Sequence, residues 1–422
     1  KKKIKGLYLN GNFGCGKTTI LNITEYIITG NLYRLFEYEF ERIVLKYEPI
    51  KSIGDIREIL IEKNSSNITV NFDGNTEKIS RIEGFHGRFP EELDGIYLKQ
   101  YSILRRIRDS FNYVYLPLNR KTVLYDLFSV KNRNFRSHNH ILKNDEEELG
   151  RYYFDQAIND VEILIKECYS RTSMMISKIN NDFRNKILKS SIEVLSSFDI
   201  NEFIKQIASS SSISDIKKTK KSFIKIAREI ELLSPDEESI YDKFFQDYID
   251  ELMSMKDNKK MEIEIIAKFQ DISRIKKIVS MAEEMEMQKE QYLKPIELFL
   301  GTINDFIKTA DDEKELKIDE YGNLYFQTIY SSDKISVQNL SSGEKQLVIF
   351  FANLIFRVKG NSSGIFVVDE PEISLHLSWQ KTFVEKALNI NKNIQLIFAT
   401  HSPELIGKYR NKTFRLVKEY IG

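Results

Sequence analysis

The feature that most constrains the fold of this chain is a glycine-rich octapeptide close to its first residue. Positions 11–18 are Gly-Asn-Phe-Gly-Cys-Gly-Lys-Thr, which fit the pattern GxxxxGK[ST] throughout. The apolar stretch IKGLYLN precedes the motif and a helical pattern follows it. In this strand–loop–helix setting, the backbone amides of such a loop wrap phosphate groups. The motif therefore predicts an α/β fold with a nucleotide-binding loop.

The residue types of the motif suggest roles for a bound nucleotide and its metal ion. Lys17 would reach the β and γ phosphate oxygens of ATP, and the Thr18 hydroxyl would coordinate Mg²⁺. Cys15 occupies a position at which the pattern accepts any residue, so we interpret it as a spacer rather than a redox sensor. The residues of this segment that we expect to bind ATP are Asn12, Gly14, Cys15, Gly16, Lys17, Thr18 and Thr19.

The overall composition argues against several classes of protein. The 63 Lys and Arg residues nearly balance the 62 Asp and Glu residues, so no global basic field marks a nucleic-acid binder. Cys15 and Cys168 offer neither a disulfide framework nor zinc-ligand spacing, which favours a reducing cytosol. No apolar run is long enough to span a bilayer, and no signal peptide precedes the first motif. We therefore expect a cytoplasmic protein without membrane contact.

Two carboxylates end a second apolar strand near the other end of the sequence, where Ile365 to Glu370 read IFVVDE. In a protein with a phosphate-binding loop this is the Walker B arrangement. Asp369 would hold Mg²⁺ through water, and Glu370 would polarise the attacking water. The adjacent second acid favours hydrolysis of the nucleotide over simple binding.

A third apolar strand, Ile394 to Ala399, leads into Thr400-His401-Ser402-Pro403. Strands of a parallel sheet place their carboxyl ends at the ligand crevice, so we expect His401 near the γ-phosphate rather than in a structural role. Its imidazole can donate a hydrogen bond to a phosphate oxygen. Glu370 and His401 are thus the predicted catalytic residues.

A second anion-binding segment, LSSGEKQLVIFF, occupies residues 340–351. It places two serines and a glycine directly before a long apolar run. Backbone amides at the start of a helix can hold an anion. The residues that we expect to contact a phosphate of ATP here are Ser341, Ser342, Gly343 and Glu344.

Residue patterns divide the chain into three parts. Residues 1–145 form an N-terminal α/β part with the glycine loop, a hairpin signal at Asp73-Gly74-Asn75 and a strand candidate from Asn112 to Leu116. Residues 146–309 carry apolar residues at helical spacing, broken at Ser209 to Ser212 and at Ser234-Pro235, which predicts about four helices.

Residues 310–422 form the third part, with a second hairpin signal at Tyr321-Gly322-Asn323. Strands that alternate with helices in this part are typical of a mostly parallel sheet covered on both faces. The sequence thus predicts an α/β fold that is interrupted by a helical insertion.

Taken in order, the glycine loop, LSSGE, VVDEPEISLH and ATHSPEL resemble the motifs of the ATP-binding cassette (ABC) ATPases of the SMC, RecF and OLD type. The resemblance covers roughly residues 1–30 and 335–410. It implies an ABC-ATPase head whose two halves are separated by a helical arm at residues 146–309. The arm is too short and too interrupted for the long coiled coils of chromosome-organising members. The chain is therefore similar in outline to compact anti-phage ATPases such as those of the Septu and PARIS systems.

The resemblance also implies how the second anion-binding segment acts. In this family it is the signature motif, whose serine and amides contact the γ-phosphate of ATP held by a second subunit, so a homo-oligomer is expected. Ser342 stands where the family has its first glycine. The D-loop would be Pro371 to His376. The family's Q-loop glutamine has no clear match: Gln100 or Asn119 could serve in its place, and Arg120 could face a phosphate.

Two further features have simpler interpretations. His138-Asn139-His140 spells HNH, but nucleases of that name need dispersed metal ligands rather than three neighbours. Basic clusters at residues 105–108 and 217–221 are typical of solvated helix faces. On one surface of an oligomer, however, they could follow a phosphate backbone.

Together these features predict a Mg²⁺-dependent ATPase whose heads engage around two ATP molecules while the arm relays that state to a partner. We expect the partner to be a separately encoded nuclease or other effector in anti-phage defence, because an OLD-type nuclease would follow the histidine motif and the sequence ends at Gly422. The alternative is a DNA-repair or DNA-end-binding ATPase of the RecF or SMC type. A relative with an anticodon-nuclease domain is disfavoured, because that domain would need a substantial C-terminal extension.

Overall fold

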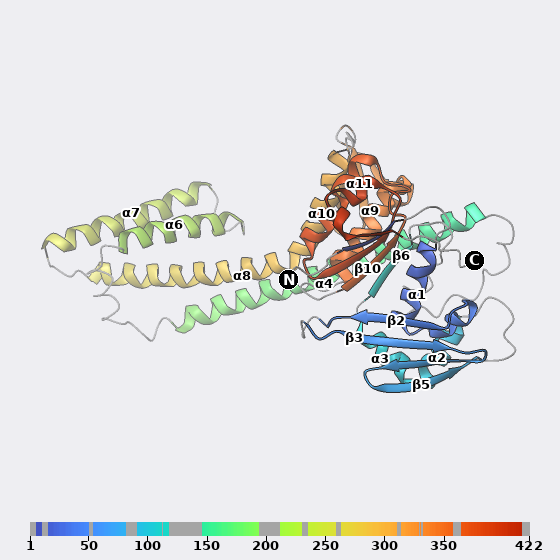
Figure 1. Ribbon diagram of the computed structural model, residues 1–422. Helices are drawn as coiled ribbons and strands as arrows, with labels where there is room; N and C mark the ends of the chain where they lie inside the picture. The colour runs from blue at the N-terminus through green and yellow to red at the C-terminus, as the bar shows by residue number, and fades with distance from the viewer. Residues whose placement is uncertain are drawn as a thin grey trace. The chain divides into compact units, whose positions relative to one another are not determined.

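The computed structural model describes most of the chain in two compact units (Figure 1). The head unit comprises Lys1–Cys168 and Ile296–Gly422, and the helical unit comprises Tyr169–Pro295. Helices α4 (Glu146–Glu193) and α8 (Ile263–Lys308) contribute residues to both units. The described residues are 6–10, 16–49, 54–81, 91–111, 113–117, 146–193, 212–229, 235–258, 263–309, 314–328, 330, 332–357 and 364–415.

A five-stranded parallel sheet forms the centre of the head unit, with the strand order β12-β1-β11-β10-β6. Its strands are β1 (Gly6–Asn10), β6 (Tyr113–Pro117), β10 (Gly364–Asp369), β11 (Ile394–Ala399) and β12 (Thr413–Arg415). The sheet therefore combines strands from both ends of the sequence, and the strand after which the glycine loop begins lies beside β11.

Helices cover both faces of this sheet, as the alternating side chains of β10 show. Val367 packs with Leu21 of α1 (Lys17–Thr29) on one face. Phe366 and Val368 belong to the large core on the other face, together with residues of α9 (Ser342–Ala352) and α10 (Leu377–Ile390). This is the α/β architecture, a parallel sheet covered on both faces, that the sequence predicts.

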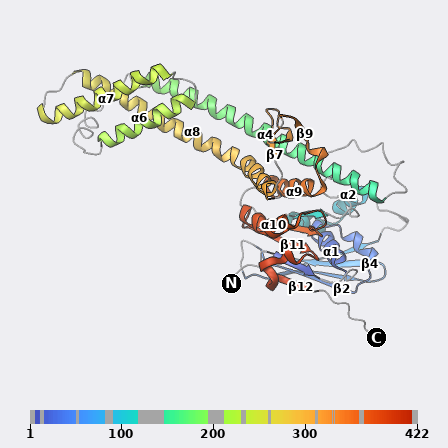
Figure 2. The same ribbon diagram turned by 90° about the horizontal axis from the view of Figure 1, so that it is seen from above.

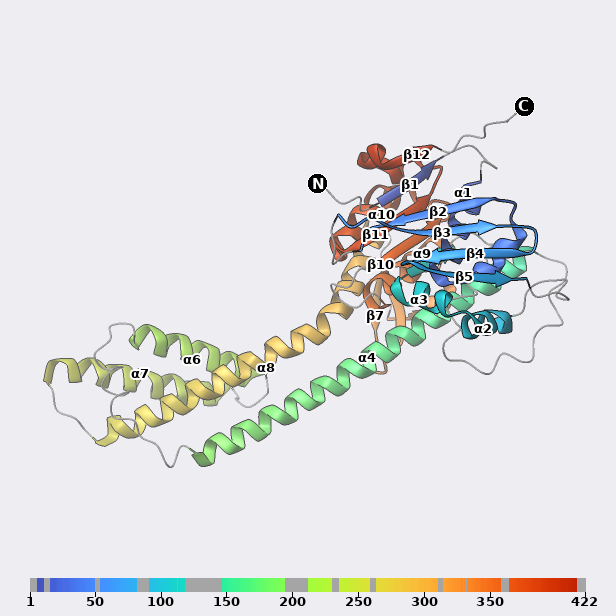
Figure 3. The ribbon, with the colours of Figure 1, turned by 60° about the horizontal axis from the view of Figure 1, so that its bottom comes forward.

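A four-stranded antiparallel sheet in the head unit has the order β2-β3-β4-β5 (Figure 3). Asp73 and Gly74 connect β4 to β5 with φ angles of 49° and 76°, the left-handed conformation that a two-residue hairpin turn requires. This confirms the predicted hairpin. The strands are β2 (Arg42–Tyr47), β3 (Arg57–Lys63), β4 (Asn67–Phe72) and β5 (Asn75–Ser80), and the neighbouring helices are α2 (Glu91–Gln100) and α3 (Ser102–Ser110).

The second predicted hairpin is also confirmed. Strands β7 (Lys314–Ile318) and β8 (Leu324–Thr328) pair antiparallel, and β9 (Lys334–Ser336) extends them to a three-stranded sheet. The Asp319 carboxylate accepts hydrogen bonds from the amides of Tyr321 and Asn323, at 3.0 and 2.8 Å, which closes the connecting loop.

The helical unit contains parts of four helices among the residues that the structure describes: α4, α6 (Ser212–Glu229), α7 (Pro235–Asn258) and α8. Helix α7 starts at Pro235, where Ser234-Pro235 predicts a helix start. In Figure 2, α6 and α7 lie beside α8. Ile216 of α6, Phe245 of α7 and Phe269 of α8 pack in one apolar cluster.

The compact helical unit is shorter than the insertion predicted at residues 146–309. Ile158 and Val161 of α4, with Phe299 and Phe306 of α8, are buried in the core of the head unit. The two ends of the inserted segment therefore fold as part of the head, a distinction that helical periodicity does not reveal. None of the described helices combines the length and apolar character needed to cross a membrane.

Candidate functional site

Two distant motifs meet at the carboxyl edge of the parallel sheet. Lys17 begins α1, and its ammonium group donates a hydrogen bond to Nε2 of His401 at 2.7 Å. The register of β10 and β11 pairs Asp369 with Ala399, which puts the predicted metal ligand beside the strand that leads to His401. Lys17, Asp369 and His401 are thus brought to one edge of the sheet, as the sequence predicts.

The start of α1 is suited to an anion. Gly16 precedes the helix with a φ of 91°, a conformation that favours glycine, and as the N-cap residue it offers no side chain to cap the first amides. Uncapped amides and the helix dipole attract negative charge. Thr18 is half-buried and Thr19 is exposed in this first turn. Asn12, Gly14 and Cys15 lie outside the described residues, so their predicted contacts with ATP stay predictions.

Asp369 fits the predicted metal site. Its side chain is buried, and neither carboxylate oxygen has a hydrogen-bond partner among the described residues. Burial raises the pKa of Asp369 to about 6, an effect that the nearby Thr18 hydroxyl and Lys17 ammonium oppose. A buried carboxylate with only the Thr18 hydroxyl and the Lys17 ammonium to offset its burial is suited to a cation that brings its own positive charge.

The oxygen donors of Thr18 and Asp369 would suit a metal that is shared with a nucleotide. The described residues contain no group of three or more His, Cys, Asp or Glu side chains that could hold a metal by themselves. Mg²⁺ is commonly bound by one or two protein oxygens together with substrate phosphates. Thr18 and Asp369 therefore fit Mg²⁺ bound with ATP.

Glu370 follows Asp369 in a strained conformation. Its φ of 46° lies in the left-handed region, and its amide donates to the Ala399 carbonyl at 2.8 Å. Such a conformation costs a non-glycine residue about 1–3 kcal/mol and persists only where neighbouring contacts fix it. Glu370 is half-buried whereas Asp369 is fully buried. The turn thus gives the two neighbouring acids different environments, as separate roles in metal binding and water activation require.

Glu372 contributes to the site in a way that sequence reasoning missed. Its Oε1 accepts hydrogen bonds from the backbone amides of both His401 and Ser402, the latter at 3.2 Å. Ser402 is held further by Gln380, which accepts from its hydroxyl at 2.6 Å. The predicted D-loop therefore fixes the segment that carries His401. The available signal was a third acid directly after Asp369, Glu370 and the proline.

The signature segment begins with a complete capping box. The Ser341 hydroxyl accepts from the Glu344 amide at 3.4 Å, and the Glu344 carboxylate accepts from the Ser341 amide at 3.0 Å. Glu344 is buried and also pairs with Lys314 of β7 at 2.5 Å. Its carboxylate thus stabilises the start of α9 within the chain, and the contact with ATP expected of Glu344 stays a prediction. Ser341 and Ser342 are exposed.

Gly343 allows α9 to approach the D-loop closely. A Cβ atom at this position would lie 2.3 Å from the backbone oxygen of Ser374. Gln346, one turn further along α9, donates to the Pro371 carbonyl at 2.7 Å. The signature segment and the D-loop therefore pack as one body.

The remaining candidate residues divide between described and undescribed segments. Gln100, at the end of α2, is exposed and donates to the Tyr101 hydroxyl at 3.3 Å. Asn119, Arg120 and the HNH tripeptide at 138–140 lie outside the described residues. The position of the Q-loop therefore remains open. Trp379 is buried and donates to the Phe306 carbonyl at 2.7 Å, which gives it a packing role.

Two curated relatives match parts of the chain. "Retron Vc95 probable ATPase" of Vibrio cholerae serotype O1 biovar El Tor is 27% identical over 193 residues, which are 42% of this chain and 37% of the relative. "Retron Ec83 probable ATPase" of Escherichia coli is 33% identical over 93 residues, 20% of this chain and 17% of the relative. The matched stretches thus span well under half the length of these relatives.

Two solved Smc head domains are similar over most of the chain, each at 13% identity. The Pyrococcus yayanosii head, with its coiled coil and joint, has a TM-score of 0.33 and covers 95% of this chain and 88% of its own. The Pyrococcus furiosus head, bound to the C-terminal domain of ScpA, has a TM-score of 0.34 and covers 95% and 85%.

A protein-family model matches residues 179–407. This range is more than half of the chain, and it includes the signature segment, the two acids at the end of β10 and the histidine motif. The chain belongs to the family described as "AAA domain, putative AbiEii toxin, Type IV TA system".

Proposed function

We propose that the chain is a Mg²⁺-dependent ATPase that completes its active sites between two copies and thereby controls an effector protein. The observation that carries this proposal is the meeting of Lys17, Asp369 and His401 at the carboxyl edge of the parallel sheet, with 2.7 Å between the Lys17 ammonium and His401 Nε2. Membership of an AAA-domain family, which implies ATP binding, supports it.

Each of these residues has a role that its position allows. Lys17 would bind the γ-phosphate, and this anion would compete with His401 for the lysine ammonium. After release from Lys17, His401 in the tautomer that carries its proton on Nε2 would donate a hydrogen bond to a phosphate oxygen. Mg²⁺ bound by Thr18 and Asp369 would neutralise developing charge. Glu370 would take the proton of the attacking water.

The signature segment supports the assembly of sites between copies. Ser341 and Ser342 are exposed, whereas α9 is buried from Gly343 onward. The exposed start of the helix is thus available to a nucleotide on a second copy. Because Gly343 packs on the D-loop, a displacement of α9 by a neighbour's nucleotide would also move Glu372. The hydrogen bond from the His401 amide to Glu372 would transmit this movement to the His401 backbone.

Helix α4 supports a relay from the signature segment. Lys345 of α9 pairs with Asp155 of α4 at 2.7 Å. Gln338, just before the signature, donates to Asn159 at 2.6 Å and to Glu162 at 2.9 Å. These polar contacts tie the N-terminal part of α4 to the segment that would sense the neighbour's ATP. We infer that α4 carries the state of the site to a partner.

The relatives support a role in anti-phage defence. Two are named as retron ATPases, and the family description names a toxin and a toxin–antitoxin system. We propose a separately encoded nuclease or other effector as the partner, as in compact systems of the Septu and PARIS kind. Co-purification with the protein that the adjacent gene encodes tests this part directly.

The ATPase proposal is tested by Glu370→Gln. This variant should lose at least about 100-fold in turnover while retaining ATP, because the general base is removed and the phosphate contacts stay. Size-exclusion chromatography with ATP should then show accumulated dimers. Glu320→Gln, at an exposed position before the β8 hairpin strand, is the matched control. Unchanged hydrolysis by Glu370→Gln would refute the assignment.

A further inference from the structure

We propose that one face of α6 binds the phosphate backbone of a nucleic-acid duplex. Six cationic residues lie in the part of this helix from Lys217 to Arg228. Lys217, Lys221 and Lys225 follow one another at intervals of four residues, which aligns them along a single side of an α-helix. The six residues, which we call the basic face, are Lys217, Lys218, Lys220, Lys221, Lys225 and Arg228.

Packing holds the basic face outward. The opposite side of α6 carries Ile216, Phe223 and Ala227, of which Ile216 and Ala227 are buried. Ile216 and Phe223 pack with Phe245 of α7 in the apolar core of the helical unit. Turning α6 to hide the lysines would expose this core, so their outward direction is fixed by the fold.

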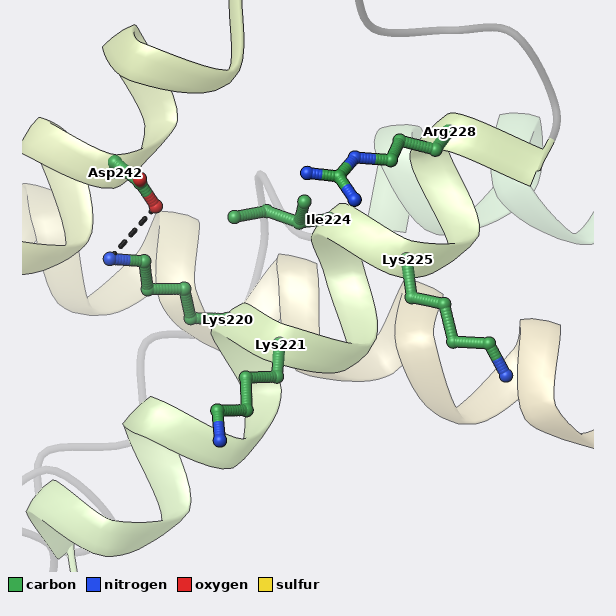
Figure 4. Close-up of a pocket in the computed structure, with 6 residues that line it drawn as sticks. All are labelled: Lys220, Lys221, Ile224, Lys225, Arg228 and Asp242. Atoms are coloured by element: carbon green, nitrogen blue, oxygen red, sulfur yellow. Dashed lines mark ion pairs between the residues drawn. The ribbon is translucent and has the colours of Figure 1, made fainter. Parts of the chain in front are cut away.

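Acids on α7 neutralise only one edge of the basic face. Lys220 pairs with Asp242 at 2.8 Å, and Arg228 pairs with Glu238 at 2.6 Å. These pairs border a shallow groove of about 420 Å³ between α6 and α7, which Figure 4 shows. In that view Lys221 and Lys225 extend from α6 away from Asp242.

Three lysines of the basic face are available to bind a ligand. Lys217, Lys218 and Lys221 are exposed, and no ion pair joins them to another residue in the described part of the chain. On the neighbouring helix α8, Glu284 pairs with Lys186 and Glu286 with Lys289. Glu283 of α8 faces α6, because its carboxylate accepts a hydrogen bond from Ser222 at 3.3 Å. This one carboxylate stands against three exposed lysines. The free charge on this surface is therefore positive, although the whole chain carries a formal charge of only +1.

The form of the surface favours a duplex over other polyanions. The basic face is about 16 Å long at 1.5 Å per residue, and a duplex presents a negative charge about every 1.7 Å of its axis. Several phosphates can thus face the lysines whatever the base sequence. Single-strand binders stack bases on aromatic side chains. The aromatic residue of α6, Phe223, is instead turned toward Tyr241 and Phe245.

An acidic protein partner fits this surface less well. Protein interfaces depend on a few aromatic, arginine or apolar anchors in pockets. The groove offers Ile224 as its apolar residue, among lysines, Arg228 and Asp242. Flexible ammonium groups without such an anchor are suited to phosphates, which they bind as point charges.

The test measures binding of the full chain to a fluorescein-labelled 30-base-pair DNA duplex by anisotropy at several salt concentrations. The triple variant Lys217→Glu, Lys218→Glu, Lys221→Glu should bind at least about 10-fold more weakly. Replacement of the same lysines by Gln should reduce the slope of log K against log salt by about 0.9 for each phosphate that is no longer neutralised, and by about 2.7 for all three. Circular dichroism verifies that the variants are folded.

The matched control carries the same change of charge at three other exposed lysines of the helical unit, as Lys178→Glu, Lys189→Glu and Lys243→Glu. It should bind the duplex as the wild type does. The proposal is overturned if the wild type does not bind the duplex, or if the triple Glu variant of α6 binds it as tightly as the control variant does. It is also overturned if the wild type binds single strands or polyglutamate as tightly as the duplex. An RNA duplex of equal length identifies which duplex is preferred. ATP is absent throughout, so the outcome is independent of the proposed ATPase.

Discussion

Replacement of Gly343 by alanine tests whether this residue is needed for close packing of the signature helix on the D-loop. The added Cβ would stand 2.3 Å from the Ser374 backbone oxygen and 3.3 Å from the Trp379 ring. A backbone atom cannot rotate aside as a side chain can, so α9 and the D-loop must separate. Gly301 in α8 provides the control, because a Cβ there meets no atom within 4 Å.

The two substitutions should change stability in opposite directions. Overpacking typically destabilises a protein by about 1–3 kcal/mol, and the higher helix propensity of alanine offsets at most about 1 kcal/mol of this loss. Gly343→Ala should therefore lower the free energy of unfolding by about 1–2 kcal/mol. Gly301→Ala gains the propensity without a clash and should raise it by about 0.5–1 kcal/mol.

Thermal unfolding followed by circular dichroism gives the measurement. A loss of about 1–2 kcal/mol should lower Tm by roughly 2–3 °C in a unit of this size, and Gly301→Ala should raise it slightly. The reasoning would be refuted by a Gly343→Ala protein that melts with the wild type. In that case the glycine would be needed for something other than contact with Ser374.

Two further predictions concern the head unit. Glu372→Ala removes the acceptor for the backbone amides of His401 and Ser402. A hydrogen bond to a charged group contributes about 1.5–3 kcal/mol, so the loss of this support should lower ATP turnover by about 10-fold or more. Glu372→Gln keeps an acceptor oxygen and should restore most of the turnover; equal defects would exclude this positioning role. Burial raises the pKa of Asp160 to about 6 against an ordinary value of 3.8. The folded state therefore binds the Asp160 proton more tightly than the unfolded state does. The resulting stabilisation is complete below about pH 4 and is lost as pH rises through 6. The Tm of the wild type relative to Asp160→Asn should fall between pH 4 and pH 7, and a constant difference would contradict the assignment.

Local chemistry explains which features the sequence could predict. The hairpin at Asp73 and Gly74 requires two left-handed residues in succession, and Asp-Gly is among the few pairs that supply them. The start of α7 at Pro235 likewise follows from the fixed φ of proline. The motif at Lys17 and the two acids at the end of β10 can be recognised from their immediate neighbours alone.

Features that depend on distant contacts were not predictable in this way. Glu372 reaches the His401 amide across 29 positions, and Lys345 reaches Asp155 across 190. Neither pair leaves a mark in local composition. The order of the parallel strands, and the burial of Ile158 in the head rather than the helical unit, also depend on which surfaces meet once the chain is folded.

The central claim is that each active site takes Lys17 from one copy and the signature segment from another. Lys17→Ala and Ser341→Arg chains should each be inactive alone, the first without a phosphate ligand and the second with a bulky side chain at the start of α9. In an equal mixture, mixed dimers contain one intact site, so about a quarter of wild-type ATPase activity should return. A mixture as inactive as its components, or a Ser341→Arg protein that hydrolyses ATP like the wild type, would contradict the account.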